Sequence, residues 1–159
     1  MQDWVFTALV GAALIHILEE YAYPGGFADA LKSLLPKSAH LLTPRFHVLV
    51  NGVFLLLCLA SALIGRANLV LSLSGFSLVF VNAILHLRGS IVTKGYYPGM
   101  ISGALLYIPL AVYAYWTFLA SGQLTWLEGV LSGLLGTLYM AALMGYVLLS
   151  AADRRRSGK

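Results

Sequence analysis

Charged residues divide the chain into apolar runs whose lengths suit membrane-spanning helices. Twenty uncharged residues separate Arg45 from Arg66, and 21 separate Arg66 from Arg88. A further 33 lie between Lys94 and Glu128. A helix needs about 20 apolar residues to cross the roughly 30 Å hydrocarbon core of a bilayer. The pattern therefore predicts spanning helices at 44–65, 67–88, 99–120 and 125–151.

The first apolar stretch is too short to cross a bilayer unless it includes two glutamates. Residues 4–18 carry no formal charge, and as a helix they would extend about 22 Å. We therefore expect Glu19 and Glu20 to lie within the bilayer, in a helix at 3–23 that stops before Pro24. This is the first of five predicted spans.

Two connections between the spans have recognisable patterns. The second and third spans nearly meet, which predicts a tight turn at 65–68 and antiparallel packing of the two helices. After the first span, apolar positions are mixed with Asp29 and Lys32. That mixture predicts a short interfacial helix at 27–35.

The composition supports the same architecture. The chain has 159 residues, of which 60% are hydrophobic and 10% are charged, outside the usual range of soluble domains. We expect a single integral membrane domain, 1–159, with an all-α fold of five transmembrane helices. The net charge of +4 arises at the edges of apolar runs and in the tail, so we expect membrane lipid rather than nucleic acid as a partner.

The distribution of Lys and Arg predicts the orientation in the membrane. Five spans place the termini on opposite sides, and nine of the ten basic residues then share the side of the C-terminus, with Arg66 alone opposite. The positive-inside rule predicts a cytoplasmic C-terminus and an external N-terminus, in a cell (inner) membrane. No positive charge precedes the first apolar stretch, so we expect that stretch to be retained rather than cleaved.

Polar side chains suited to metal coordination recur on three predicted helices. His16 is followed by Glu19 and Glu20, which share its helical face because they lie three and four residues later. Two pairs with a spacing of four begin the second span and end the third: His47 with Asn51, and Asn82 with His86. At 1.5 Å per residue, all of them lie about 3 to 10 Å from the cytoplasmic ends of their helices.

Such a polar layer needs compensation inside a membrane. An ionisable side chain at the bilayer centre costs at least ~2.5 kcal/mol on insertion scales. Imidazole and carboxylate groups are ligands of Zn and Fe ions, whose charge would offset the glutamates. We predict a site near the cytoplasmic face for one or two divalent ions, Zn or Fe, with His16, Glu19, Glu20, His47 and His86 as ligands and Asn51 and Asn82 in support. A metal-free hydrogen-bonded network joining three helices is the alternative.

Two tyrosines and two basic residues lie on the same predicted side. Tyr96 and Tyr97 precede a Pro-Gly pair at the start of the fourth span, and either phenol is a candidate proton donor. Interfacial tyrosines are also ordinary in membrane proteins. Arg88 and Lys94 are candidates for binding a phosphate headgroup, although the positive-inside rule explains both equally well.

Three short motifs resemble those of the HXXEE family of small integral membrane proteins. The stretch His16-Ile17-Leu18-Glu19-Glu20 has the motif that names the family. Asn82 and His86 fit its NxxxH element, and Tyr96 and Tyr97 with Pro98-Gly99 are close to its YxPG element, of which a strict match would use Tyr96. The motifs extend over more than half of the chain. The resemblance implies a metal-dependent membrane enzyme whose matched residues are His16, Glu19, Glu20, Asn82 and His86, and it implies no substrate.

Together these patterns predict an intramembrane metal-dependent enzyme. Our first expectation is a hydrolase acting on a lipid or other apolar substrate, in which one of Glu19 and Glu20 is a ligand and the other a general base. The alternatives are a non-haem iron oxygenase or desaturase, a metal-free acid/base isomerase, and a metal or proton transporter. The outer half of the first four spans has few polar residues, which argues against a conduit.

Overall fold

The computed structural model describes residues 3–22 and 26–156. Within these ranges the chain contains helices and no strand. The elements are α1 Trp4–Ala22, α2 Gly26–Leu34, η1 Pro36–Ser38, α3 Pro44–Ile64, η2 Gly65–Ala67, α4 Leu69–Thr93, α5 Met100–Ser102, η3 Gly103–Tyr107, α6 Ile108–Ala120 and α7 Trp126–Arg156. Five helical segments are long and apolar enough to span a membrane, and the fourth of them consists of α5, η3 and α6 in succession. The predicted all-α bundle of five membrane-length helices is confirmed, and the chain is a membrane protein.

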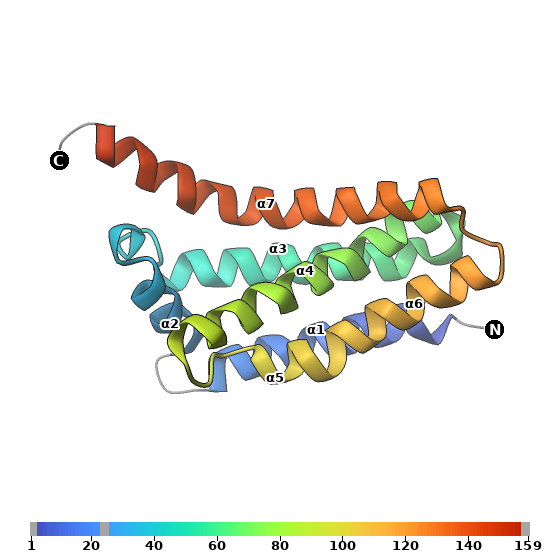
Figure 1. The fold of residues 1–159 in the computed structure, drawn as a ribbon, viewed down its shortest axis with the longest axis horizontal. Helices are drawn as coiled ribbons and strands as arrows, with labels where there is room; N and C mark the ends of the chain where they lie inside the picture. The colour runs from blue at the N-terminus through green and yellow to red at the C-terminus, as the bar shows by residue number, and fades with distance from the viewer. Residues whose placement is uncertain (1–2, 23–25, 157–159) are drawn as a thin grey trace.

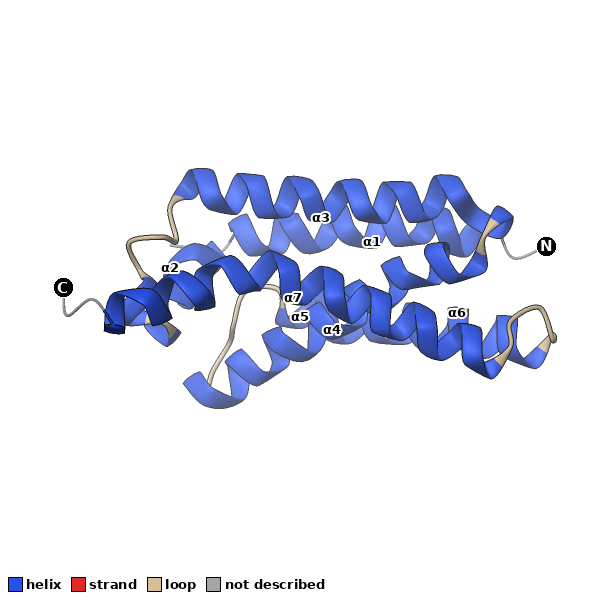
Figure 2. Cartoon of the chain, turned by 90° about the horizontal axis from the view of Figure 1, so that it is seen from above, coloured by secondary structure: helices blue, strands red, loops and turns tan. Residues whose placement is uncertain are grey.

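The spans run alternately up and down an elongated bundle (Figure 1). α1, α4 and α7 run in one direction, and α3 and α6 run in the other. α2 and η1 lie across the end of the bundle at which α1 ends. Figure 2 shows α3 beside α1, and α7 passing over α4, in agreement with the close contacts of both pairs. One end of the bundle therefore holds the ends of α1 and α4, the start of α3, and α2.

Local capping explains why the predicted turn between α3 and α4 forms. The Asn68 side chain accepts a hydrogen bond from the Leu71 N–H at 3.1 Å, which caps α4. Gly65 has a φ of +50°, which a residue without a Cβ adopts readily. The Ser72 hydroxyl donates to the Gly65 carbonyl at 2.6 Å across the turn. The predicted tight turn is confirmed.

Two helices extend beyond their predicted ends. α4 continues to Thr93 rather than ending at 88, and α7 continues to Arg156 rather than 151. An Arg side chain can extend along apolar surface to water, so a basic residue does not itself end a helix. α1 ends at Ala22, and the predicted end at Tyr23 lies outside the described residues. The interfacial helix predicted at 27–35 is α2, Gly26–Leu34.

α4 is the most buried of the five spans, because small side chains let its neighbours approach closely. A Cβ on Gly136 of α7 would lie 2.4 Å from the Ser74 carbonyl oxygen. The Tyr115 hydroxyl of α6 joins Ser77 of α4, at 2.6 Å, to Ser132 of α7, at 2.5 Å. Tight packing and this polar link hold α4, α6 and α7 together.

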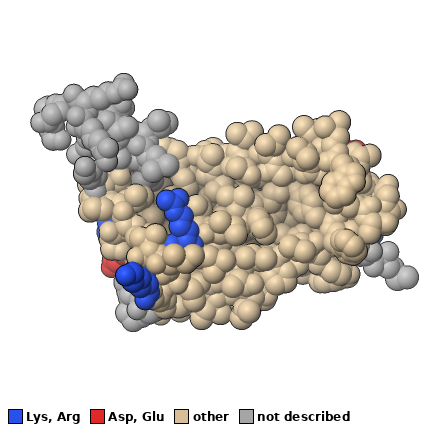
Figure 3. Space-filling model, in the orientation of Figure 1, with Lys and Arg blue, Asp and Glu red and all other residues tan. Residues whose placement is uncertain are grey.

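Charged side chains lie near the two ends of the bundle. On the face drawn in Figure 3, Lys and Arg side chains gather toward the end that carries α2. At the opposite end Arg66 bonds to Asp3 at 2.6 Å and to Gln123 at 2.5 Å, linking the start of α1 to both connections there. The long apolar middle of the bundle has the composition expected for a hydrocarbon environment.

Candidate metal centre

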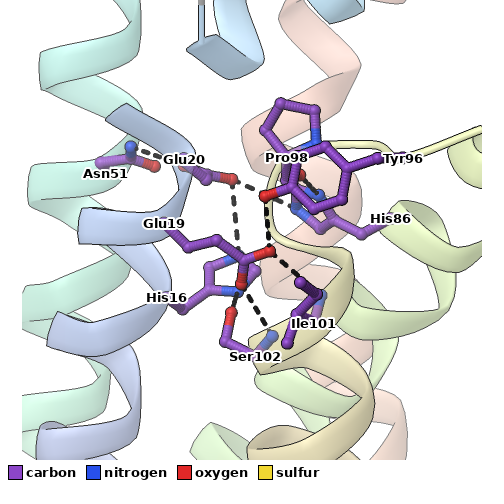
Figure 4. A network of polar contacts seen from close by, with 9 residues as sticks. All are labelled: His16, Glu19, Glu20, Asn51, His86, Tyr96, Pro98, Ile101 and Ser102. Carbon is purple, nitrogen blue, oxygen red and sulfur yellow. Dashed lines mark hydrogen bonds and ion pairs between the residues drawn. The ribbon is translucent and has the colours of Figure 1, made fainter. Parts of the chain in front are cut away.

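Three buried side chains from α1 and α4 converge at the end of the bundle that carries α2. His16, Glu20 and His86 are each less than 5% exposed. The Oε1 atom of Glu20 lies 3.4 Å from Nε2 of His16 and 3.2 Å from Nε2 of His86. Figure 4 shows both rings directed at this carboxylate. One ligand atom from each residue lies within 4.8 Å of the others. Two ligand atoms about 2 Å from one ion are at most about 4 Å apart, so the three side chains could hold a single ion after a small approach.

The orientation of His86 constrains where its proton is. Its Nδ1 lies 2.5 Å from the carbonyl oxygen of Pro98, which can only accept a hydrogen bond. Nδ1 therefore carries the hydrogen, and a neutral His86 presents a bare lone pair at Nε2. That lone pair faces a carboxylate oxygen of Glu20, which is also an acceptor. Two acceptors so close together are favourable only if a proton or a cation lies between them.

His16 is oriented in the same way from the opposite helix. Its Nδ1 lies 2.8 Å from the hydroxyl oxygen of Ser102, and its ring contacts the tilted ring of Tyr107 with centroids 4.5 Å apart. Its Nε2 is buried and has no hydrogen-bond partner. Partners at Nδ1 that fix a ring and leave Nε2 for the ion are typical of metal-binding histidines.

Gly99 makes room for the two imidazoles. Its φ is +87°, and a Cβ there would lie 2.6 Å from Nδ1 of His86 and 2.7 Å from Cε1 of His16. A residue with a side chain would therefore be strained in its backbone and would also displace both rings. The Pro-Gly pair supplies a carbonyl that orients His86 and a backbone that both rings can approach.

Glu20 also bonds to α3. The amide of Asn51 donates a hydrogen bond to Oε2 of Glu20 at 2.9 Å. The predicted meeting of polar stripes from three helices therefore occurs at this carboxylate.

Glu19 has a different set of partners from its neighbour. Its Oε1 accepts hydrogen bonds from the Tyr96 hydroxyl at 2.9 Å and the Ile101 N–H at 3.0 Å. Its Oε2 accepts from the Ser102 N–H at 2.7 Å. These amides belong to the first turn of the fourth span, whose N–H groups lack helical partners. Glu19 thus anchors the start of that span to α1 (Figure 4).

His47 lies close to the cluster without being part of it. Its Nδ1 bonds to the Thr43 carbonyl oxygen at 3.1 Å, and its Nε2 is buried without a hydrogen-bond partner. The ring of Phe27 contacts both His47 and His86, with centroids 5.7 and 4.8 Å away. The compact group of ligand atoms contains His16, Glu20 and His86, whereas His47 is outside it.

The two tyrosines face different parts of the site. Tyr96 bonds to Glu19, whereas Tyr97 is 2% exposed and packs against Gly89 and His86. Burial and the charge of Glu20 raise the pKa of the Tyr97 phenol well above its usual value. Tyr97 therefore keeps its proton at neutral pH, and its hydroxyl can donate a hydrogen bond next to the cluster.

A cavity of about 430 Å³ adjoins the cluster. Among the predicted site residues, Glu20, Asn51, Asn82, His86 and Tyr97 line it, and His16, Glu19, His47 and Tyr96 do not. The buried Oδ1 atom of Asn82 has no hydrogen-bond partner. The cavity therefore brings one face of the His–Glu cluster together with amide and phenol groups that could bind a ligand.

Ser102, Phe27 and Tyr107 are parts of the site that the sequence did not reveal. Ser102 and Tyr107 adjoin or belong to a π-helical stretch, Gly103–Tyr107, that has no recognisable sequence signal. Such stretches often occur at functional sites. The position of Ser102, three residues after Gly99, would have been the available hint.

The comparison with family models gives one match. The model described as protein of unknown function with HXXEE motif matches residues 4–114. Searches of curated proteins and of solved structures found no match. Because the match extends over more than half of the chain, the protein belongs to the HXXEE family, as the motifs indicated.

Proposed function

We propose that this member of the HXXEE family is an intramembrane metal-dependent enzyme, with His16, Glu20 and His86 as the ligands of a divalent ion. One observation carries the proposal: the Nε2 lone pair of His86 faces a Glu20 oxygen at 3.2 Å, while its Nδ1 donates to a carbonyl. A cation would satisfy both acceptors and offset a carboxylate that is 4% exposed.

The donor set suits two metals. Two histidines and one glutamate form the protein ligands of several catalytic zinc sites. Two histidines and one carboxylate are also the ligand set of non-haem Fe(II) oxygenases. A bound Zn ion would polarise an ester-like oxygen and supply an activated water. We therefore favour a hydrolase acting on a lipid or other apolar substrate and keep an iron oxygenase or desaturase as the alternative.

The chain's own residues would bind and orient the substrate. Tyr97 keeps its proton and lines the cavity, so its hydroxyl is a candidate proton or hydrogen-bond donor. Asn51 and Asn82 add amide groups along the same wall. Glu19 would be a positioning residue, because its oxygens already accept hydrogen bonds that hold the fourth span.

A metal-free function is the second candidate, and the same geometry supports it. A protonated His86 would donate to Glu20 through Nε2 and form a buried ion pair. Such a pair could exchange a proton with a substrate in the cavity, as an acid/base isomerase requires.

Elemental analysis distinguishes the two. We expect protein purified in mild detergent without chelator to carry a stoichiometric transition metal, and His86→Gln to lose it. The matched control is His40→Gln, because His40 is exposed and lies outside the cluster. The metal proposal would be contradicted, and the isomerase favoured, if the wild-type protein carried no metal after purification and bound none after incubation with Zn or Fe(II).

For the orientation, we propose an inner membrane with the C-terminus in the cytoplasm and the N-terminus outside. The cluster would then lie near the cytoplasmic face. Nine of ten basic residues belong to the predicted inner side, and Figure 3 shows Lys and Arg toward that end of the bundle.

A further inference from the structure

The cavity beside the cluster has the size of a site for one small ligand. Its volume of about 430 Å³ falls in the range of about 300–1,000 Å³ that is usual for ligand pockets. Most of its wall is apolar, and its polar groups are concentrated near Glu20 and His86. An elongated molecule with one polar end would match this distribution.

Two of the helices that line the cavity, α3 and α7, make few close contacts with each other. Val50 and Phe54 come from α3, and Met140 and Met144 come from α7. Both helices are spans, yet close contacts between them are sparse, whereas each packs against α4. α2 adds further leucines at the end of the bundle. An apolar chain could therefore reach the cavity from the bilayer, between α3 and α7.

The cavity lining contains one basic residue. Arg88 lines the cavity, whereas Lys94, the other candidate for headgroup binding, does not. Arg88 is exposed and forms no hydrogen bond or ion pair with any described residue. Glu20, the acidic residue of the lining, faces His16 and His86 and accepts a hydrogen bond from Asn51. A ligand in this cavity would thus meet a free guanidinium near the end of the bundle.

We propose that the cavity binds a single-chain membrane amphiphile with an anionic headgroup, held at Arg88, and with its chain between α3 and α7. The guanidinium fork suits phosphate and carboxylate oxygens. Arg88 and His86 line the same cavity, so an amphiphile held at Arg88 would have part of its length in the space that the cluster borders. That such an amphiphile is the substrate rests on the proposed enzyme function, whereas its binding does not.

Photolabelling tests the site directly. The protein is reconstituted in phosphatidylcholine nanodiscs with an alkyl phosphate that carries a diazirine in its chain, and labelled peptides are identified by mass spectrometry. We expect labels on cavity-lining residues of α7 and α3, and competition by dodecyl phosphate. A carboxylate probe with the same chain tells fatty acids from phosphates, and an alcohol probe provides the neutral reference.

Matched variants separate the chain site from the headgroup site. Met140→Trp fills the cavity and should lower cavity labelling at least about tenfold, whereas Leu138→Trp, on the exposed face of α7, should not. Val50→Trp repeats the test from α3. Arg88→Gln should lower labelling by the anionic probes about fivefold and leave the alcohol probe unchanged. Arg45→Gln removes a charge outside the lining and should change neither.

The outcomes distinguish this inference from the proposed function. The binding site would be overturned if the labels were spread over lipid-facing residues and if neither Met140→Trp nor Val50→Trp changed the labelling. If Arg88→Gln lowered labelling by the charged and the neutral probes equally, the proposed recognition of an anionic headgroup would be overturned. Metal content is measured on the same samples. Intact labelling without metal contradicts only the metal enzyme, and metal without labelling contradicts only the amphiphile site.

Discussion

Glu19 and Glu20 are adjacent in the sequence and have different surroundings. Glu20 is 4% exposed and faces two imidazoles, whereas Glu19 accepts hydrogen bonds from the Tyr96 hydroxyl and from main-chain N–H groups of the fourth span. Successive residues on a helix point about 100° apart, so one carboxylate can face the cluster while the other faces the neighbouring backbone. The two acids therefore have separate predicted roles.

Replacing each glutamate with glutamine tests these roles. We expect Glu20→Gln to reduce bound metal to background, because an amide is a poor substitute for an anionic ligand. Glu19→Gln should retain the metal and unfold at lower temperature, since it loses charge-assisted hydrogen bonds that each contribute about 1.5–3 kcal/mol. Elemental analysis and thermal unfolding in detergent measure the two effects. If both variants lost the metal and Glu19→Gln kept its thermal stability, the separate roles proposed for the two glutamates would be contradicted.

Gly99 offers a test of the backbone on which the histidines depend. Gly99→Ala places a Cβ against both imidazoles at a φ of +87°, so we expect a loss of about 1–3 kcal/mol in unfolding free energy together with reduced metal content. Gly95→Ala is the control in the same loop, because its Cβ would meet nothing closer than 3.9 Å. The explanation fails if Gly99→Ala matches Gly95→Ala in both stability and metal content.

The sequence indicated which residues lie close together, but it did not indicate which atoms they contact. Helical spacing placed His16 and Glu20 on one helical face. Their similar predicted depth in the membrane indicated that His86 and Asn51 lie near them. Spacing does not determine how each helix rotates about its own axis, and His47, which shares the expected depth, lies outside the compact group. Nor does it identify Pro98 as the acceptor for His86, because a carbonyl oxygen has no sequence signature.

At the scale of the elements, the positions of charged residues predicted the spans. The helices themselves continue past some of those charged residues. Uncharged runs near 20 residues are long enough to cross a bilayer, so the number and order of spans followed from the sequence. The ends of α4 and α7 were placed too early, because basic residues were treated as stops. The π-helical stretch in the fourth span begins at Gly103, where the chain packs closely on α4, since a Cβ there would lie 3.2 Å from Ala83 Cα.

The packing of α7 on α4 is tested by two glycines of the same helix. Gly136→Ala places a Cβ 2.4 Å from the Ser74 carbonyl oxygen and 2.7 Å from the Leu78 nitrogen, and backbone atoms yield little. We expect a loss of about 1–3 kcal/mol in unfolding free energy. Gly145→Ala meets nothing within 4 Å and should be neutral or stabilising by up to about 1 kcal/mol. Equal thermal stabilities of the two variants would mean that α7 does not pack on α4 in this way.

At the scale of the whole molecule, the candidate site lies at one end of the bundle. The last turns of α1 and α4 and the start of the fourth span meet there, next to α2. An odd number of spans makes this the end at which the C-terminal helix also finishes. The side of the membrane on which the C-terminus lies therefore decides whether the site faces the cytoplasm.

Reporter fusions test that orientation. Nine of the ten basic residues belong to the side that holds the C-terminus, and translocating such loops is unfavourable, so we expect this side to remain cytoplasmic. A phosphatase that is active only outside the cytoplasm should be inactive when fused after residue 159 and active when inserted at Gly122, in the connection before α7. A fluorescent protein that matures only inside should give the opposite result at both positions. Active phosphatase at residue 159 would reverse the topology and place the His–Glu cluster on the outer face, while leaving its internal geometry unchanged.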